Sequence, residues 1–295
     1  MSLATLHVAS ISGGKDSQAV AIILKKRYPA QQIKLVFADT GNEHQITLDH
    51  LDYLREALEM PIDVVRGDFA QDLARKRRYC LEVWPTKGVP LDVCERAAAA
   101  LEPTGVPYLD LCLWKGRFPA RRSQFCTQFL KRYPLDRYCL DLMAAGHSLQ
   151  VWQGVRRDES QQRAAAIKRE LTPEGWWIRR PIAAWTARQV IDLSLREGIK
   201  LNPLYSLGFG RVGCAPCINA KKSERIREWE RLVGIATKHG ASSFFPAPND
   251  GRGDLRGRNI DDYLQWSLTT RGGRQYDMEM TGPVPACSSV YGLCE

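Results

Sequence analysis

Residues 6–17, with the sequence LHVASISGGKDS, decide the fold of this chain. The apolar run Leu6–Ile11 predicts a strand, and the glycines directly behind it predict a tight turn that opens a helix. Two adjacent glycines let the backbone approach an anion closely, and the amides of a helix start offer N–H donors and positive dipole to phosphate. A lysine adds positive charge, and an aspartate is placed to hold a Mg²⁺ ion that bridges phosphate oxygens. The predicted phosphate-binding loop consists of Ser12, Gly13, Gly14, Lys15, Asp16 and Ser17.

The first half of the chain alternates short apolar runs with segments of helical periodicity, which is typical of a parallel α/β sheet. Leucines at positions 48, 51, 54 and 58 recur at helical spacing between two such runs. Thr186 is a good N-cap for a helix that runs to about Glu197. The segments expected to form strands are Leu6–Ile11, Ile33–Ala38, Ile62–Val65, Val151–Val155 and Trp176–Ile182.

The predicted fold class is therefore α/β: a Rossmann-like open parallel sheet with a small C-terminal cysteine-rich module. We expect residues 1–200 to form the nucleotide-binding domain and residues 201–295 to form the cysteine module, with a metal or Fe–S site. Residues from about 70 to 125 mix arginine-rich and proline-rich stretches, and we expect an irregular insertion or lid there.

Composition narrows the class of protein. The chain has 295 residues, no apolar segment long enough to span a bilayer and no basic-then-apolar leader, so we expect a cytoplasmic protein without a membrane partner. Its net charge of +9 suits an anionic partner such as a nucleotide or a nucleic acid. With no export signal, its nine cysteines favour metal or redox chemistry over disulfides.

Asp39, Thr40 and Gly41 follow the second predicted strand. Ligands of open parallel sheets bind at the carboxyl ends of the strands, so this loop should lie beside the glycine loop. Asp39 is a candidate partner for a ribose hydroxyl or an adenine edge, with a simple helix cap at this turn as the alternative.

Gly154, Arg156 and Arg157 follow another predicted strand. Arginine forks suit phosphate or pyrophosphate because two parallel N–H donors match two oxygens. Since the two arginines are adjacent, we expect only one of them to face a ligand. The alternative is a solvated helix start rich in charged residues.

Taken together and in this order, these segments resemble the PP-loop ATP pyrophosphatases of the phosphoadenosine phosphosulfate reductase family. The resemblance implies an adenine nucleotide α-hydrolase fold that binds ATP and Mg²⁺. The family includes sulfonucleotide reductases, the small subunit of sulfate adenylyltransferase and the sulfur-inserting component of DNA phosphorothioation systems. The segments that carry the resemblance are Ser12–Ser17, Asp39–Glu43, Cys126–Lys131, Gly154–Ser160, Arg180–Ile182 with Trp185, and Asn202–Tyr205.

Cys214 and Cys217 form a CxxC pair, and Cys287 and Cys294 lie near the end of the chain. Two such pairs can make one four-thiolate site for an iron–sulfur cluster or for zinc, with free reduced thiols as the alternative. A [4Fe-4S] cluster is preferred over Zn²⁺ because the phosphorothioation component that the chain resembles carries one.

Cys126 is a separate candidate. It lies beside Arg121, Arg122 and Lys131, a positive setting that is expected to lower the pKa of its thiol. It is a candidate sulfur-carrying nucleophile, or a cluster ligand in place of one of the C-terminal cysteines, with a buried core cysteine as the alternative. The cysteines expected to be core or incidental are Cys80, Cys94, Cys112 and Cys139.

The resemblance also bears on the reaction. A complete glycine loop favours cleavage of ATP between its α and β phosphates, with transfer of AMP to an oxygen of an acceptor. The chain ends Tyr291–Glu295, without the Glu-Cys-Gly tail of the reductases. The favoured function is therefore adenylation of an acceptor coupled to sulfur transfer. The expected catalytic residues are Lys15, Asp16, Arg156, Arg157 and Cys126.

The acceptor would be a nucleic acid or a small molecule, and the sulfur donor a protein such as a cysteine desulfurase. Two alternatives stay open. One is a sulfonucleotide reductase that uses a thiol reductant, and the other is a non-catalytic module that binds a nucleotide or a nucleic acid.

Overall fold

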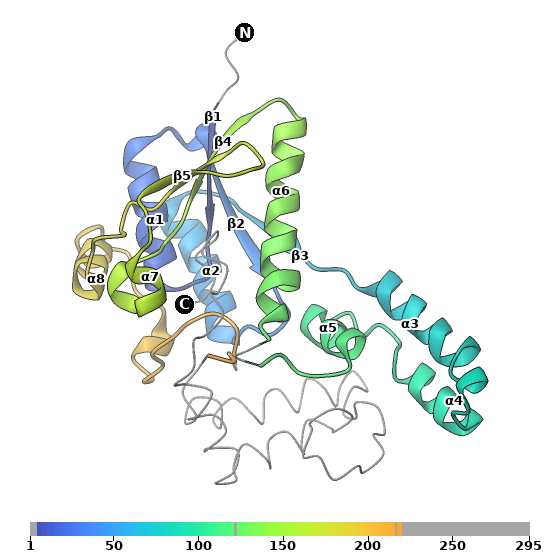
Figure 1. Ribbon diagram of the computed structural model, residues 1–295. Helices are drawn as coiled ribbons and strands as arrows, with labels where there is room; N and C mark the ends of the chain where they lie inside the picture. Colours follow the sequence, from blue (N-terminus) through green and yellow to red (C-terminus); the bar gives the residue numbers. More distant parts are fainter. Residues whose placement is uncertain (1–4, 121–122, 216, 220–295) are drawn as a thin grey trace.

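The computed structural model describes residues 5–120, 123–215 and 217–219. Its centre is a six-stranded sheet in the order β3-β2-β1-β4-β6-β5, in which only the β5–β6 pair is antiparallel. This confirms the predicted α/β class with an open, mostly parallel sheet (Figure 1). The strands are β1 (Thr5–Ser10), β2 (Ile33–Asp39), β3 (Ile62–Arg66), β4 (Ser148–Trp152), β5 (Arg169–Leu171) and β6 (Trp177–Arg179).

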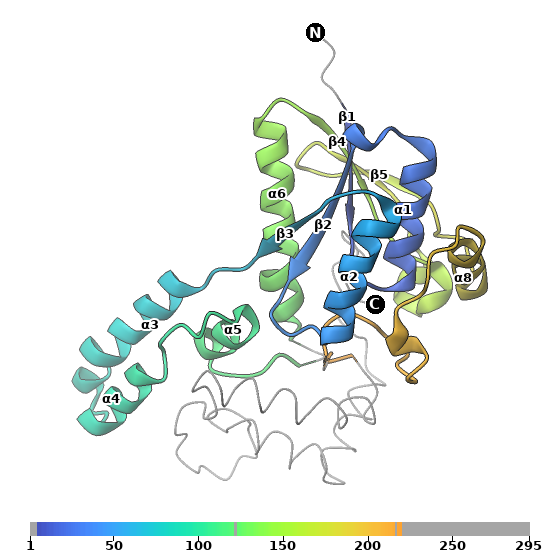
Figure 2. The ribbon, with the colours of Figure 1, turned by 180° about the vertical axis from the view of Figure 1, so that it is seen from behind.

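Helices cover both faces of the sheet. On one face α1, α2 and α8 pack over a cluster that includes Ile22, Leu54 and Val190, and on the other α6 packs over Leu149 and Ile178 (Figures 1 and 2). The α8 helix begins at the predicted cap, where Thr186 and Gln189 form a capping box. The α-helices are α1 (Lys15–Arg27), α2 (Gln45–Leu58), α3 (Ala70–Glu82), α4 (Leu91–Ala99), α5 (Pro107–Lys115), α6 (Tyr133–Ala144), α7 (Gln161–Ala164) and α8 (Ala187–Arg196). The other helical segments are η1 (Ala30–Gln32), η2 (Pro85–Lys87), η3 (Thr127–Arg132), η4 (Arg157–Glu159) and η5 (Pro203–Tyr205).

The strand order creates a topological switch point beside β1. The chain runs outward from β1 through β2 to β3, and then returns through α6 to place β4 on the other side of β1. The loops that follow β1 and β4 therefore leave the sheet in opposite directions and open a crevice at the carboxyl ends of the strands. These are the loops that contain the glycine motif and Gly154.

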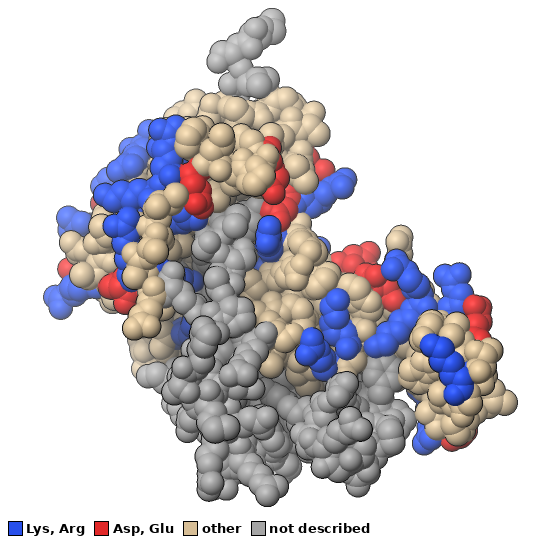
Figure 3. All heavy atoms as spheres, in the orientation of Figure 1, with Lys and Arg blue, Asp and Glu red and all other residues tan. Residues whose placement is uncertain are grey.

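The segment expected to be irregular is largely helical, so that expectation is wrong. In α3 and α4 the residues Leu73, Cys80 and Ala97 join a separate apolar cluster with Leu109 and Cys112 of α5. The pair α3–α4 projects away from the sheet as an arm, and Lys and Arg side chains gather on its surface (Figures 1 and 3). The boundaries expected at residues 200 and 201 stay predictions, because most of the second segment lies outside the described residues.

Within the described ranges, no helix has the length and apolar character needed to cross a membrane.

The fold leaves no space for a side chain at Gly154. A Cβ there would lie 2.8 Å from the Asp16 carbonyl carbon and 2.9 Å from the Ser17 amide nitrogen, both backbone atoms of α1. Because backbone cannot move aside as a flexible side chain does, Gly154→Ala should destabilise the protein by roughly 1–3 kcal/mol. Thermal unfolding followed by circular dichroism measures this change. An unchanged melting temperature would contradict the close packing of these two loops.

Candidate nucleotide and thiol site

The glycine loop is held by its own serines. The Ser17 hydroxyl accepts a hydrogen bond from the Ser12 amide at 3.2 Å and donates to the Gly14 carbonyl at 3.0 Å. Gly13 has a φ of +78°, which only glycine adopts without strain, and its carbonyl accepts a bond from the Asn202 side chain at 3.2 Å. The loop is therefore ordered with its amide donors at the start of α1, as the sequence predicts for a phosphate site.

Asp16 and Arg156 form a buried ion pair across the switch point. The side chains are 1% and 5% exposed, and Arg156 Nε lies 2.6 Å from Asp16 Oδ1. Arg156 also pairs with Asp158 at 2.5 Å, so its guanidinium links the glycine loop to the loop after β4. The second carboxylate oxygen of Asp16, Oδ2, is buried and accepts no hydrogen bond, and the Lys15 ammonium lies 3.4 Å from it. This oxygen is the atom of Asp16 that can take a cation.

The loop after β2 packs against the CxxC segment. Glu43 and Cys214 form an antiparallel backbone bridge, and the Ala215 amide donates to the Asn42 carbonyl at 2.7 Å. Asp39 is held by Arg66, whose Nη2 lies 2.6 Å from Asp39 Oδ2. These contacts fix the CxxC segment directly over the loop that is predicted to bind adenosine.

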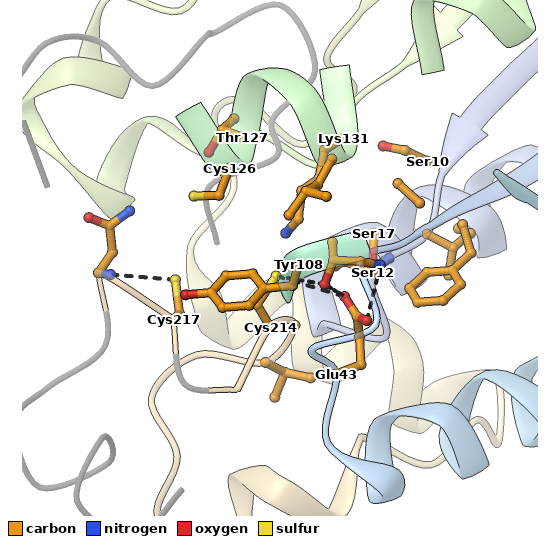
Figure 4. Close-up of a pocket in the computed structure, with 18 of the residues that line it drawn as sticks. Ser10, Ser12, Ser17, Glu43, Tyr108, Cys126, Thr127, Lys131, Cys214 and Cys217 are labelled. Atoms are coloured by element: carbon orange, nitrogen blue, oxygen red, sulfur yellow. Dashed lines mark hydrogen bonds between the residues drawn. The ribbon is translucent and has the colours of Figure 1, made fainter. Parts of the chain in front are cut away.

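Glycine loop and cysteines line one cavity, which also includes the buried Thr40. Ser12 and Ser17 lie on one side, and Figure 4 shows Cys126 projecting from the η3 region toward Cys214 and Cys217 on the facing loop. The cavity has about 60 Å³ of room, whereas one water needs roughly 10–15 Å³. The thiols therefore border open space, although Cys126 also packs against the apolar cluster of α3, α4 and α5.

A lysine and a glutamate that the sequence reasoning did not single out as site residues also face this cavity. Glu43 accepts hydrogen bonds from the Thr40 hydroxyl at 2.7 Å and from the Cys214 thiol at 3.7 Å. Burial raises the pKa of Glu43, and the Thr40 bonds and Lys131 oppose that rise. Burial would lower the pKa of Lys131, but Cys214, Glu43 and Cys217 raise it overall, so the ammonium stays charged.

The pKa of the Cys126 thiol is raised and not lowered as expected, and two of the three basic residues behind that expectation, Arg121 and Arg122, lie outside the described residues. Burial raises the pKa of this thiol to about 12, the thiols of Cys214 and Cys217 add to the rise, and Lys131 offsets only part of it. Burial likewise raises the pKa of Cys214 to about 11. Without another positive charge, these thiols stay protonated at neutral pH.

The predicted four-thiolate site can be followed only in part. Cys287 and Cys294 lie outside the described residues, whereas Cys126, Cys214 and Cys217 line the cavity. Among the described residues, no three ligand side chains are close enough together to hold a metal ion as they stand. The four cysteines expected to be core are buried, as predicted: Cys80, Cys94, Cys112 and Cys139.

The remaining predicted residues fall on both sides of the crevice. Gly41 packs against Val106 and Pro107 at the start of α5. Arg157 is exposed, and its Nε donates to the Ala166 carbonyl at 2.8 Å. Arg156 is thus the inward-facing member of the arginine pair, in contact with Asp16.

The position of Lys131 depends on a π-helix. Residues Thr127–Arg132 are wound with i→i+5 hydrogen bonds, of which the bond from the Tyr133 amide to the Gln128 carbonyl is one. This wider turn brings positions five apart onto one face, so Cys126 and Lys131 both line the cavity. The five-residue spacing of Cys126 and Lys131 was visible in the sequence, but on an ordinary α-helix two residues five positions apart lie on different faces.

Thiol reactivity tests this electrostatic description. A shift from the ordinary value of 9.0 to about 12 lowers the thiolate fraction of Cys126 about 1,000-fold at pH 8. Alkylation of Cys126 in the metal-free folded protein should therefore be at least roughly 100-fold slower than in the urea-unfolded chain. Lys131→Met should slow Cys214 further, because this ammonium lowers the pKa of that thiol. Mass spectrometry after iodoacetamide treatment gives the rates, and equal rates in both states would refute the protonated pocket.

Comparison with known protein families gives one match. The sequence model of the phosphoadenosine phosphosulfate reductase domain family matches residues 6–86 and 109–220. Residues 87–108, which include α4, lie between the matched segments.

Individual relatives are similar over very different lengths. An uncharacterized 37.8 kDa protein in the gpa 5′ region of Escherichia phage 186 is 41% identical over 327 aligned positions, which cover 99% of this chain and 97% of that protein. The adenosine 5′-phosphosulfate reductase of Rhizobium meliloti is 34% identical over 103 residues, which cover 32% of this chain and 39% of the reductase.

A crystal structure of phosphoadenylyl-sulfate reductase from Candida auris, in a phosphate complex, matches with a TM-score of 0.44 and 17% identity, over 70% of this chain and 80% of that one. A likeness of this size carries no argument about function, and the fold rests on the strand order given above.

Proposed function

This chain belongs to the phosphoadenosine phosphosulfate reductase domain family, and we propose that it cleaves ATP to AMP and pyrophosphate, adenylates an acceptor and couples this step to sulfur transfer. One observation carries the proposal. Ser12 and Ser17 of the glycine loop line the same cavity as Cys126, Cys214 and Cys217, so nucleotide and sulfur chemistry would share one space.

The glycine loop would bind the phosphates. Its amides and the Lys15 ammonium, which is 16% exposed, provide positive charge where the bond between the α and β phosphates breaks. The buried Oδ2 of Asp16 fits a Mg²⁺ ion, because it is a carboxylate oxygen with no hydrogen-bond donor. When bound, Mg²⁺ would neutralise charge on the leaving pyrophosphate.

The proposed reaction has two steps, adenylation of the acceptor and replacement of AMP by sulfur. An acceptor hydroxyl oxygen bonds to the α phosphorus as the bond to the β phosphate breaks, which releases pyrophosphate and a proton. Sulfide, released from the persulfide of a donor protein by a thiol reductant, then bonds to the activated atom of the acceptor, and AMP leaves with the former acceptor oxygen. Nucleic-acid and small-molecule acceptors both fit this scheme, and the net charge of +9 suits the former.

The three cavity thiols fit a [4Fe-4S] cluster by their chemistry, because thiolates are its usual ligands and a metal centre would compensate their charge. Cys126 with the CxxC pair would supply three ligands, and the described residues place no fourth cysteine in the cavity. When bound, the cluster would offer iron at which sulfur is held near the nucleotide. Zn²⁺ is the alternative occupant.

Removal of the lysine charge tests the nucleotide step. Lys15→Ala should lower the rate of AMP and pyrophosphate release by roughly 10²–10³-fold, because a preorganised charge at the breaking bond is lost. Lys25→Ala removes the same charge from an exposed site on α1, where Lys25 pairs with Glu59, and should leave the rate unchanged. Chromatography of products from α-labelled ATP reports the rates. AMP release at the wild-type rate in the Lys15 variant would reject the proposed mechanism.

Removal of single thiols tests the sulfur step. Anaerobically purified protein should contain iron and acid-labile sulfide, and Cys126→Ala, Cys214→Ala or Cys217→Ala should each lose most of the iron. Cys139→Ala, on the buried face of α6, is the matched control and should retain it. Elemental analysis and visible absorption measure the content. Zinc without iron in the wild type would reject the cluster, and sulfite release from a sulfonucleotide without turnover of ATP would favour a reductase.

A further inference from the structure

Arg211 is half-buried, and two of its guanidinium nitrogens have no hydrogen-bond partner among the described residues. These two atoms, Nε and Nη2, are inaccessible to solvent. A buried donor without an acceptor costs free energy, and more so when the group is charged. An arginine in this condition fits an anion that arrives from outside the chain.

Residues near Arg211 in the sequence contact the glycine loop. Arg211 belongs to a segment that wraps this loop, in which the Asn202 side chain bonds to the Gly13 carbonyl and the Tyr205 hydroxyl accepts a bond from the Lys15 amide at 3.1 Å. The next residue, Val212, lines the same cavity as Ser12 and Ser17.

The charged side chains around Arg211 are largely paired with one another, and Glu159 is a carboxylate close enough to Arg211 for their charges to interact. Arg156 is paired with Asp16 and Asp158, and Arg163 is paired with Glu159. Burial raises the pKa of Glu159, Arg163 opposes the rise, and Asp16, Arg211 and Arg156 are close enough to contribute. Arg211 therefore lies at the edge of the Asp16–Arg156 cluster without a hydrogen-bonded carboxylate among the described residues.

We propose that Arg211 binds the pyrophosphate end of the nucleotide and thereby selects a triphosphate over a nucleotide with a shorter anionic chain. This inference rests on the proposed function, because it assigns the far phosphates of ATP to a residue of that site. The guanidinium would supply two adjacent N–H donors to two phosphate oxygens. A phosphosulfate group offers similar oxygens, so the two sources must be separated by experiment.

Calorimetric titration of the full chain distinguishes a pyrophosphate ligand from a phosphosulfate ligand. The titrants are Mg–pyrophosphate, Mg–ATP, AMP and adenosine 5′-phosphosulfate. Arg211→Gln should weaken pyrophosphate and ATP by roughly 10- to 100-fold, the loss expected for a charge-assisted hydrogen bond, and leave AMP unchanged. The affinities of Arg211→Lys for pyrophosphate and ATP should fall between those of wild type and those of Arg211→Gln. Arg188→Gln removes the same charge from a side chain that is 85% exposed on α8, and should change none of the affinities.

Equal pyrophosphate affinity in wild type and Arg211→Gln overturns the inference, whereas the proposed function would survive if the wild type still forms AMP. A loss confined to adenosine 5′-phosphosulfate also overturns it and assigns the arginine to a sulfonucleotide. Conversely, pyrophosphate binding that depends on Arg211, in a protein that never cleaves ATP, supports this inference and rejects the proposed function. Melting temperatures of the variants within a few degrees of wild type show that the changes are not due to unfolding.

Discussion

The contact between the loop after β4 and the first turn of α1 is the constraint on which the site depends. Gly154 lets the two backbones meet, and the Arg156–Asp16 ion pair closes over the contact. A buried pair of this kind adds little net stability, because desolvation offsets the attraction, but removal of one partner leaves an uncompensated charge that costs roughly 3–5 kcal/mol. Its contribution is therefore orientation: arginine holds Oδ1, and Oδ2 of Asp16 stays buried without a hydrogen bond.

The parts of the fold that the sequence predicted are those fixed by local patterns. The strand before the glycine loop and the helix capped by Thr186 depend on apolar runs and cap chemistry within a few residues. The helices of the arm were missed because their apolar residues, such as Leu73 and Ala97, pack in a cluster apart from the sheet. The sequence placed Cys126 near Lys131, but the π-helix that turns both toward the cavity was not predicted, because no periodicity of the sequence indicates it.

The thiol pocket shows why residue type alone predicted a lowered pKa for Cys126, whereas the structure raises it. Nearby basic residues suggested a stabilised thiolate, yet Lys131 is shared among Glu43, Cys214 and Cys217. One ammonium cannot compensate a carboxylate and several thiolates at once in a site removed from water. The pocket is therefore stable either with its thiols protonated or with an added centre of positive charge. This condition, and not the mere number of cysteines, is what makes a metal centre a sensible occupant.

A single segment joins the two ends of the site. Asn202 and Tyr205 hold the glycine loop, and nine residues after Tyr205 the Cys214 backbone pairs with Glu43 below the thiols. Arg211 lies between these two anchors. An anion that draws the arginine toward the glycine loop would pull on the strand that carries Cys214, and a centre that holds Cys214 would in turn fix where the arginine can reach. Residues 202–214 therefore connect the glycine loop to the thiols by a short stretch of chain.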